Sequence, residues 1–224
     1  MDDNGVADGP FKGGGVSMRG VVVAILAGML SAGCSVFGIR TTEEPAYTVE
    51  RQVGGAEIRR YGPRVAAETV VTGDALAARR VGFERLAGYI FGGNAGSQRI
   101  AMTAPVAQEG GTKIAMTAPV DQAPVGDAWR IRFFMPAAAR LESLPEPNDR
   151  SVSLVRVPGE VVAVWRYSGV PSVAAVRAGS AALLAALAQG GVATEGAVFS
   201  WFYDPPWTLP PLRRNEAVVR LRSE

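Results

Sequence analysis

Residues 56–71 read AEIRRYGPRVAAETVV, a stretch rich in β-forming residues that a Gly-Pro pair interrupts at 62–63. Such a run predicts a long strand that bends at the pair. An amphipathic helix is predicted directly after it, over residues 74–91, because apolar residues recur there at intervals that place them on one face. This face consists of Leu76, Phe83, Leu86, Ala87 and Ile90.

The same order of elements returns in the second half of the chain. Residues 151–167 read SVSLVRVPGEVVAVWRY, which predicts another long strand with an interruption at Pro158-Gly159. A second helix is predicted over residues 172–188. We expect Leu86 and Leu184 to be buried at equivalent places against the sheet. The expected apolar face of the second helix consists of Val176, Leu183, Leu184 and Leu187.

Shorter strands are predicted after each helix. The sequence IAMTAPV occurs twice, at 100–106 and 114–120, and this spacing predicts two arms of a hairpin. Pro105 and Pro119 cannot donate to a strand ladder, so each is expected at an edge or a strand end. The predicted strands are 99–107, 113–121 and 129–135 in the first half, and 198–203 and 217–221 in the second.

Both halves therefore have the order strand, helix, strands, with the turn PEPNDR at 145–150 between them. Strands flanked by two amphipathic helices predict an α+β fold, with the helices packed on a largely antiparallel sheet. The chain has 224 residues, of which 48% are hydrophobic. This suffices for one domain, expected over residues 46–224, and an N-terminal extension.

The composition limits the possible chemistry. The chain has no His, which removes His-assisted nucleophiles and most zinc sites. Its one Cys excludes an intrachain disulfide and a CxxC site. No serine-hydrolase elbow, Walker loop or HExxH motif occurs, so we expect no catalytic activity. A net charge of +2, without a basic stripe, predicts no nucleic-acid partner.

The N-terminal region has the features of a bacterial lipoprotein signal. Residues 1–17 are Gly-rich and polar, and we expect them to be disordered or to precede the true start. Residues 18–33 combine a positive start, a short apolar run and small residues, and the string LSAGC ending at Cys34 resembles a lipobox. Lipidation of Cys34 predicts an outer-membrane lipoprotein facing the periplasm, with a linker over 34–45. An uncleaved membrane helix over 20–39 and a soluble protein with a buried Cys are the alternatives.

Several segments together resemble the SOUL/haem-binding-protein family. These are the two IAMTAPV strings, the stretch WRIRFFMPAAARLESLPEPNDRSVSL, the pattern VAVWRYSG and the ending YDPPWTLPPLRRNEAVV. The resemblance covers about residues 45–222. It implies a distorted, partly closed antiparallel sheet with two helices, built from two pseudo-symmetric βαββ-type halves. It also implies noncovalent binding of haem or another tetrapyrrole in a shallow apolar groove. The His proposed as an axial ligand in some members cannot exist here.

Candidate ligand-binding residues follow from what a porphyrin requires: an apolar cleft, cations for the propionates and, optionally, an iron ligand. Arg213 and Arg214 could instead form an internal network that fixes the last strand. Trp207 could be an aromatic wall of the groove or could simply pack its own turn. A non-haem small-ligand or partner-binding envelope module is the alternative function, and a hydrolase on the same fold is a further one. The candidate iron ligands are Met102, Met116 and Tyr167, with Tyr61, Tyr89 and Tyr203 as further tyrosines, and the candidate cations are Arg99, Lys113, Arg213 and Arg214.

Overall fold

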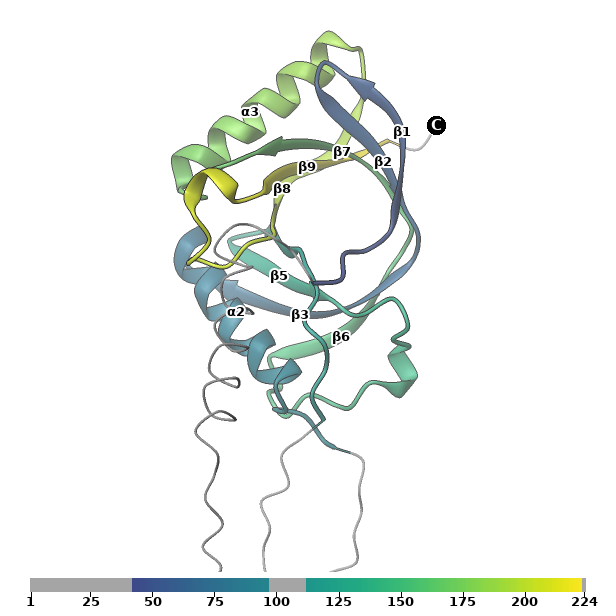
Figure 1. Cartoon of the computed structure of the whole chain (residues 1–224), viewed down its shortest axis with the longest axis vertical. Coiled ribbons are helices and arrows are strands. Elements are labelled where there is room, and N and C mark those ends of the chain that lie inside the picture. Colours follow the sequence, from purple (N-terminus) through teal and green to yellow (C-terminus); the bar gives the residue numbers. More distant parts are fainter. Residues whose placement is uncertain (1–41, 97–111, 223–224) are drawn as a thin grey trace, which may run out of the picture.

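The computed structural model describes residues 42–96 and 112–222. Its strands form one antiparallel sheet in the order β1-β2-β7-β9-β8-β4-β5-β3-β6, which curls into a partial barrel with two helices outside it (Figure 1). The predicted α+β class is confirmed. The first half contains β1 (Tyr47–Val53), β2 (Ala56–Tyr61), β3 (Arg64–Thr72), α2 (Ala75–Ile90), β4 (Val120–Val125), β5 (Ala128–Phe134) and η1 (Leu141–Ser143). The second half contains β6 (Val152–Val157), β7 (Glu160–Tyr167), α3 (Val173–Gln189), β8 (Thr194–Phe202), η2 (Pro210–Leu212) and β9 (Asn215–Leu221).

The two predicted long strands each bend at the expected pair and each become two strands. β2 pairs with β7 on one side of the bends, and β3 pairs with β6 on the other, and the same antiparallel register continues through both. The bends lie against one another: a Cβ on Gly159 would approach the carbonyl oxygen of Tyr61 to 3.2 Å. A side chain at residue 159 would therefore crowd the backbone of the neighbouring bend.

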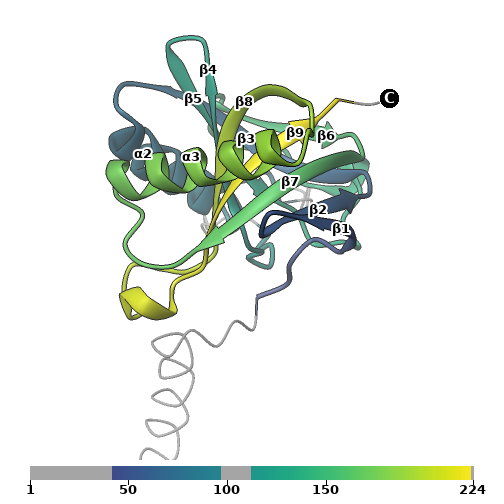
Figure 2. The same ribbon diagram turned by 90° about the horizontal axis from the view of Figure 1, so that it is seen from above.

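The pairing of β2 with β7 and of β3 with β6 curls the sheet into the partial barrel, and the two halves of this barrel are related by pseudo-symmetry. Apart from β1, the strand order reads β2-β7-β9-β8 from one end and β6-β3-β5-β4 from the other, and the two halves meet where β4 pairs with β8. α2 packs on β3 and β5, whereas α3 packs on the equivalent strands β7 and β9. Figures 1 and 2 both place the helices outside the barrel, one over each half. The predicted βαββ-type halves and helix positions are confirmed.

The helix ends follow from their capping residues. The Asp74 side chain accepts from the backbone N–H groups of Leu76 and Ala77, each at 3.0 Å, and Ser172 accepts from Ala175 at 3.2 Å. These contacts satisfy donors that the first helical turn leaves without backbone partners. No helix among the described residues is both long enough and apolar enough to cross a membrane.

Two predictions about the helix faces are wrong in detail. Leu184 is 44% exposed, whereas its neighbour Leu183 is fully buried against β7 and β9. Adjacent helical residues point about 100° apart, so only one of two neighbouring leucines can face the sheet. Phe83 and Leu76 are also exposed, while Leu86 is buried as predicted.

The strand predicted over 113–121 is also wrong. Residues 112–119 form no strand, apart from a bridge between Thr117 and Glu43, and β4 begins only at Val120. Pro119 has no N–H to donate, which favours a strand end at this residue. The hairpin partner of β4 is β5, joined through Gly126 at a φ of 55°. The first IAMTAPV string lies outside the described residues.

Candidate functional site

The interior of the barrel is lined by charged and aromatic side chains. In β9, Ala217 and Val219 pack under α3, so the alternating residues Glu216, Val218 and Arg220 point into the barrel. Glu216 is fully buried and accepts two hydrogen bonds from Arg59, at 3.0 and 3.1 Å.

Tyr203 and Arg214 complete this network. The Tyr203 hydroxyl donates to Glu216 at 2.7 Å, and Arg214 donates to Glu216 at 2.9 Å and pairs with Glu44 at 2.9 Å. Burial lowers the pKa of Arg214, but the charges of Tyr203, Glu216 and Glu44 raise it above its ordinary value. Arg214 therefore belongs to an internal network, which is the alternative role that the sequence offered for it.

A second network lies further along the barrel. Glu160 accepts from Arg220 at 2.7 Å and pairs with Arg64. The guanidinium of Arg64 lies between the rings of Tyr61 and Phe134, 4.5 Å from each ring centre. The side chain of Arg64 is 9% exposed.

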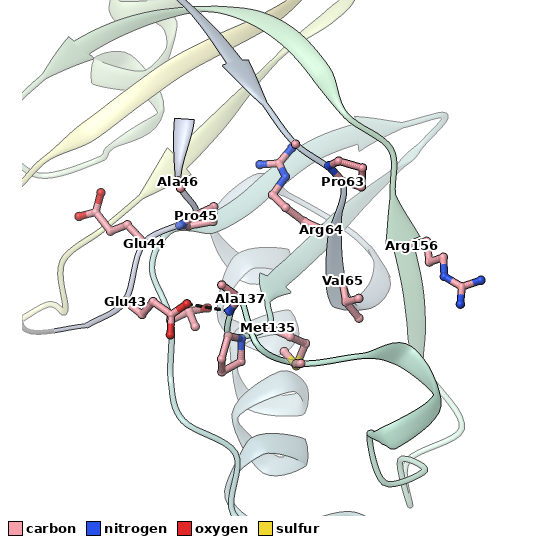
Figure 3. Close-up of a pocket in the computed structure, with 14 residues that line it drawn as sticks. Glu43, Glu44, Pro45, Ala46, Pro63, Arg64, Val65, Met135, Ala137 and Arg156 are labelled. Carbon is pink, nitrogen blue, oxygen red and sulfur yellow. Dashed lines mark hydrogen bonds between the residues drawn. The ribbon is translucent and has the colours of Figure 1, made fainter. Parts of the chain in front are cut away.

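A pocket of about 430 Å³ opens at the mouth of the barrel, which we call the barrel-mouth pocket (Figure 3). Its walls come from the segment before β1, from the bend between β2 and β3, and from the residues after β5. Most of the wall is apolar, and Arg64 is the buried cation among the lining residues. The lining consists of Glu43, Glu44, Pro45, Ala46, Gly62, Pro63, Arg64, Val65, Thr117, Met135, Pro136, Ala137, Ala139 and Arg156.

A shallower depression of about 490 Å³ lies outside the barrel, between the end of β7 and η2. η2 lies against the connection from β7 to α3 (Figure 2), where Gly169 N–H donates to Pro210 O at 2.9 Å. We call it the Tyr167–Arg213 depression, because it brings these two sequence-predicted residues together. It is lined by Arg166, Tyr167, Ser168, Pro211, Leu212 and Arg213.

The two named residues of this depression are held in place differently. Arg213 donates through Nε to the carbonyl oxygen of Thr208 at 2.7 Å and also donates to Pro206 O. Tyr167 packs its ring against Gly179 of α3, where a Cβ would approach the ring to 2.8 Å. Its buried hydroxyl has no hydrogen-bond partner among the described residues. Burial raises the pKa of Tyr167 to about 12, although the charge of Arg79 lowers it.

The other candidates do not gather at this depression. Lys113 and Met116 are exposed in the segment before β4. Tyr61 and Tyr203 lie inside the barrel, and the Tyr89 hydroxyl donates to Pro145 O at 2.9 Å. Arg99, Met102 and Cys34 lie outside the described residues.

Sequence reasoning missed three arginines that the structure brings to the cavities: Arg64, Arg156 and Arg166. Arg64 lies at the barrel-mouth pocket, and its only sequence signal is its place directly after the Gly-Pro bend. Arg166 lies in the Tyr167–Arg213 depression, where its neighbour Tyr167 had been identified. Within the described ranges, no group of three or more Cys, Asp or Glu side chains is placed to hold a metal ion.

Comparison with known proteins agrees with this architecture. The C-terminal domain of EcmrR has a TM-score of 0.52 at 7% identity, over 80% of this chain and 99% of that one. EcmrR in a complex with DNA has a TM-score of 0.50 at 9% identity, over 92% and 65%. A hydrolase from Listeria innocua has a TM-score of 0.48 at 13% identity, over 77% and 94%. At these identities, the two EcmrR structures show similarity of fold alone. No curated protein matched the sequence.

A family model gives the closer assignment. The model described as "SOUL heme-binding protein" matches residues 42–220, which include every described helix and nearly all of β9. The match covers well over half of the chain, and it agrees with the motifs and with the pseudo-symmetric barrel. The chain therefore belongs to the SOUL haem-binding protein family.

Proposed function

We propose that this protein binds haem or a related tetrapyrrole noncovalently in the Tyr167–Arg213 depression, without catalysing a reaction and without an imidazole ligand. One observation carries the proposal: the depression places two cations, Arg166 and Arg213, beside an aromatic ring and the apolar side chains of Pro211 and Leu212. A porphyrin presents a flat apolar ring and two carboxylates, which match this combination.

The environment of Tyr167 argues against a strong bond to iron. Tyrosine ligates haem iron through its oxygen, most strongly as the phenolate. Burial raises the pKa of Tyr167 to about 12, so the phenol remains protonated at neutral pH. The apolar contacts and the two arginines are indifferent to the metal, and binding should depend little on iron.

The test is a titration of the untagged protein with haemin and with the iron-free porphyrin. A His tag would supply the imidazole that the chain lacks. We expect the two affinities to agree within about tenfold, or about 1.4 kcal/mol. A hundredfold preference for haemin would contradict the proposal and would require an iron ligand.

A charge reversal locates the site. Arg166 is exposed, so Arg166→Glu should leave the fold intact and weaken both porphyrins by about the same factor, roughly tenfold. Arg150→Glu is the matched control, because Arg150 is also exposed but lies outside the depression. Equal effects of the two variants would indicate a nonspecific effect of charge and would place the ligand elsewhere.

We also propose that the domain is held at the outer membrane by lipid on Cys34, facing the periplasm. The support is the sequence alone: a short apolar run and the string LSAGC. Each buried methylene of an acyl chain contributes about 0.8 kcal/mol to membrane attachment. Intact-mass analysis of the membrane form should show cleavage before Cys34 and a lipid adduct. A mature protein that retains residues 18–33 would contradict this.

A further inference from the structure

The barrel-mouth pocket is distinct from the depression proposed for the tetrapyrrole, and its walls indicate a different kind of ligand. Apolar surface on several sides of the pocket comes from Pro45, Pro63, Val65 and Met135 (Figure 3). Pro136 also lines the pocket. A volume of about 430 Å³ lies within the range of small-molecule sites. The shape therefore suits a small molecule with a hydrocarbon part.

Arg64 provides the polar element of this pocket. Glu160 accepts from one terminal nitrogen of its guanidinium, but Nε and Nη1 are buried and have no hydrogen-bond partner among the described residues. An arginine keeps its charge even when buried, and its fixed donors match a carboxylate. A buried cation with unused donors beside an apolar pocket is suited to an anionic head group.

The acidic residues of the lining do not offset this preference, because they already have partners. Glu43 accepts from the backbone N–H of Ala137 at 2.7 Å, and Glu44 pairs with Arg214 at 2.9 Å. The other lining arginine, Arg156, is exposed and pairs with Glu142. Among these charged residues, Arg64 is the buried one with donors left unused.

We propose that the barrel-mouth pocket is a binding site for a small organic carboxylate. The carboxylate accepts from the guanidinium donors of Arg64 that Glu160 leaves unused, and the hydrocarbon part lies between the proline and methionine side chains of the walls. This site is separate from the tetrapyrrole site, so the protein can hold both ligands at once.

Calorimetric titration with octanoate, 1-octanol and octylammonium tests the head group, and benzoate tests whether a flat hydrocarbon is accepted as well as a flexible one. We expect octanoate to bind at least tenfold more tightly than octanol, and octylammonium to bind more weakly still. Tighter binding of the ammonium would show that Glu43 and Glu44 determine the selectivity and would overturn the proposal. Octanol binding as tightly as octanoate would also overturn it.

Two variants test whether octanoate binds in the barrel-mouth pocket. Arg64→Met should abolish the preference for octanoate over octanol, while Glu160 keeps Arg220 as a partner. Ala137→Trp should block all binding by filling the pocket without touching Arg64, and Ala138→Trp is its matched control, because Ala138 is exposed and does not line the pocket. Octanoate binding that survives Ala137→Trp would refute this location, even if Arg64→Met fails to fold.

The same titrations separate this site from the tetrapyrrole site. Arg166→Glu should leave octanoate affinity unchanged, and saturating octanoate should leave porphyrin affinity unchanged. If neither porphyrin binds but octanoate does, the tetrapyrrole proposal fails and the carboxylate site stands. If porphyrin displaces octanoate and Arg166→Glu weakens both, one site serves both ligands and the separate carboxylate site is refuted.

Discussion

Glu216 accepts hydrogen bonds from three side chains inside the barrel: Arg59, Tyr203 and Arg214. Its replacement by Ala leaves two buried or half-buried arginines without their shared counter-ion. Breaking a buried pair costs about 3–5 kcal/mol when the remaining charge is uncompensated. Arg59 keeps Glu57 and Arg214 keeps Glu44 as partners, so we expect the Glu216→Ala variant to lose up to about this much free energy of unfolding in urea.

The control is an ion pair that water screens. Glu142 and Arg156 pair on the surface with side chains that are 67% and 68% exposed. Exposed pairs contribute about 0–1 kcal/mol, so Glu142→Ala should change the free energy of unfolding by no more than that. Equal losses in the two variants would show that burial of Glu216 has no special effect.

Asp121 predicts a pH dependence of stability. It lies fully inside the barrel and accepts from the Trp201 indole N–H at 3.2 Å. Burial raises its pKa from 3.8 to about 6, against the lowering effect of Arg130 and Arg132. Between these values the folded state binds more protons than the unfolded state, so the contribution of Asp121 to stability is lost as pH rises through about 6.

This contribution is on the order of 3 kcal/mol over the window from pH 4 to 7. Asp121→Asn removes the titration and keeps an oxygen that accepts from Trp201. We expect the stability of the native protein, relative to Asp121→Asn, to fall as pH rises across this window, as measured by urea unfolding at each pH. A difference that is constant, or that grows with pH, would contradict the raised pKa.

The ion pairs inside the barrel could not be predicted from the sequence. Arg59 and Glu216 are 157 positions apart in the sequence, and only the β2-β7-β9 pairing brings them together. Tyr167 and Arg213 could be proposed one by one from residue type and motif. Their meeting at one depression depends on the contact of Gly169 with Pro210, which no local pattern encodes.

At the scale of the elements, α2 approaches β5 closely at one residue. A Cβ on Gly82 would lie 2.4 Å from Cγ1 of Ile131, which is fully buried, so the side chains must shift to admit it. Overpacking of this kind costs about 1–3 kcal/mol. We expect Gly82→Ala to lower the free energy of unfolding by about that amount, although Ala is the better helix former.

The matched control is on the same helix. Gly88 is exposed, and no atom lies within 4 Å of its added Cβ. Gly88→Ala should therefore stabilise the protein by about 0.5–1 kcal/mol through helix propensity alone. Urea unfolding of both variants gives the measurement, and a stabilising effect of Gly82→Ala would show that the helix is not held so close to the sheet.

The elements were predicted well where short-range patterns determine them. The spacing of apolar residues along a helix is a local signal, and both helices agree with the prediction to within a residue or two. Local sequence could not show whether Leu183 or Leu184 faces the sheet, because this depends on the rotation of α3 about its axis. The sequence before Pro119 resembles a strand, but its pairing depends on the chain around it.

At the scale of the whole molecule, the halves are interlocked rather than merely adjacent. β2 belongs to the first half but pairs with β7 of the second, and β6 belongs to the second but pairs with β3 of the first. Neither half can keep all of its ladder hydrogen bonds when the other unfolds. The pseudo-symmetry therefore does not imply two independent folding units.

We expect unfolding in urea to be a single cooperative transition, since loss of either half breaks ladders in both. Fluorine-labelled tryptophan provides separate reporters, because Trp129 packs near α2 in the first half and Trp165 near α3 in the second. Their folded resonances should disappear at the same urea concentration.

Gly179→Ala crowds Tyr167 in the second half, where the added Cβ would approach the ring to 2.8 Å. It should shift the Trp129 midpoint as far as the Trp165 midpoint. If Trp165 loses its folded signal first while Trp129 is unaffected, the halves unfold separately, and the β2–β7 and β3–β6 pairs do not couple them.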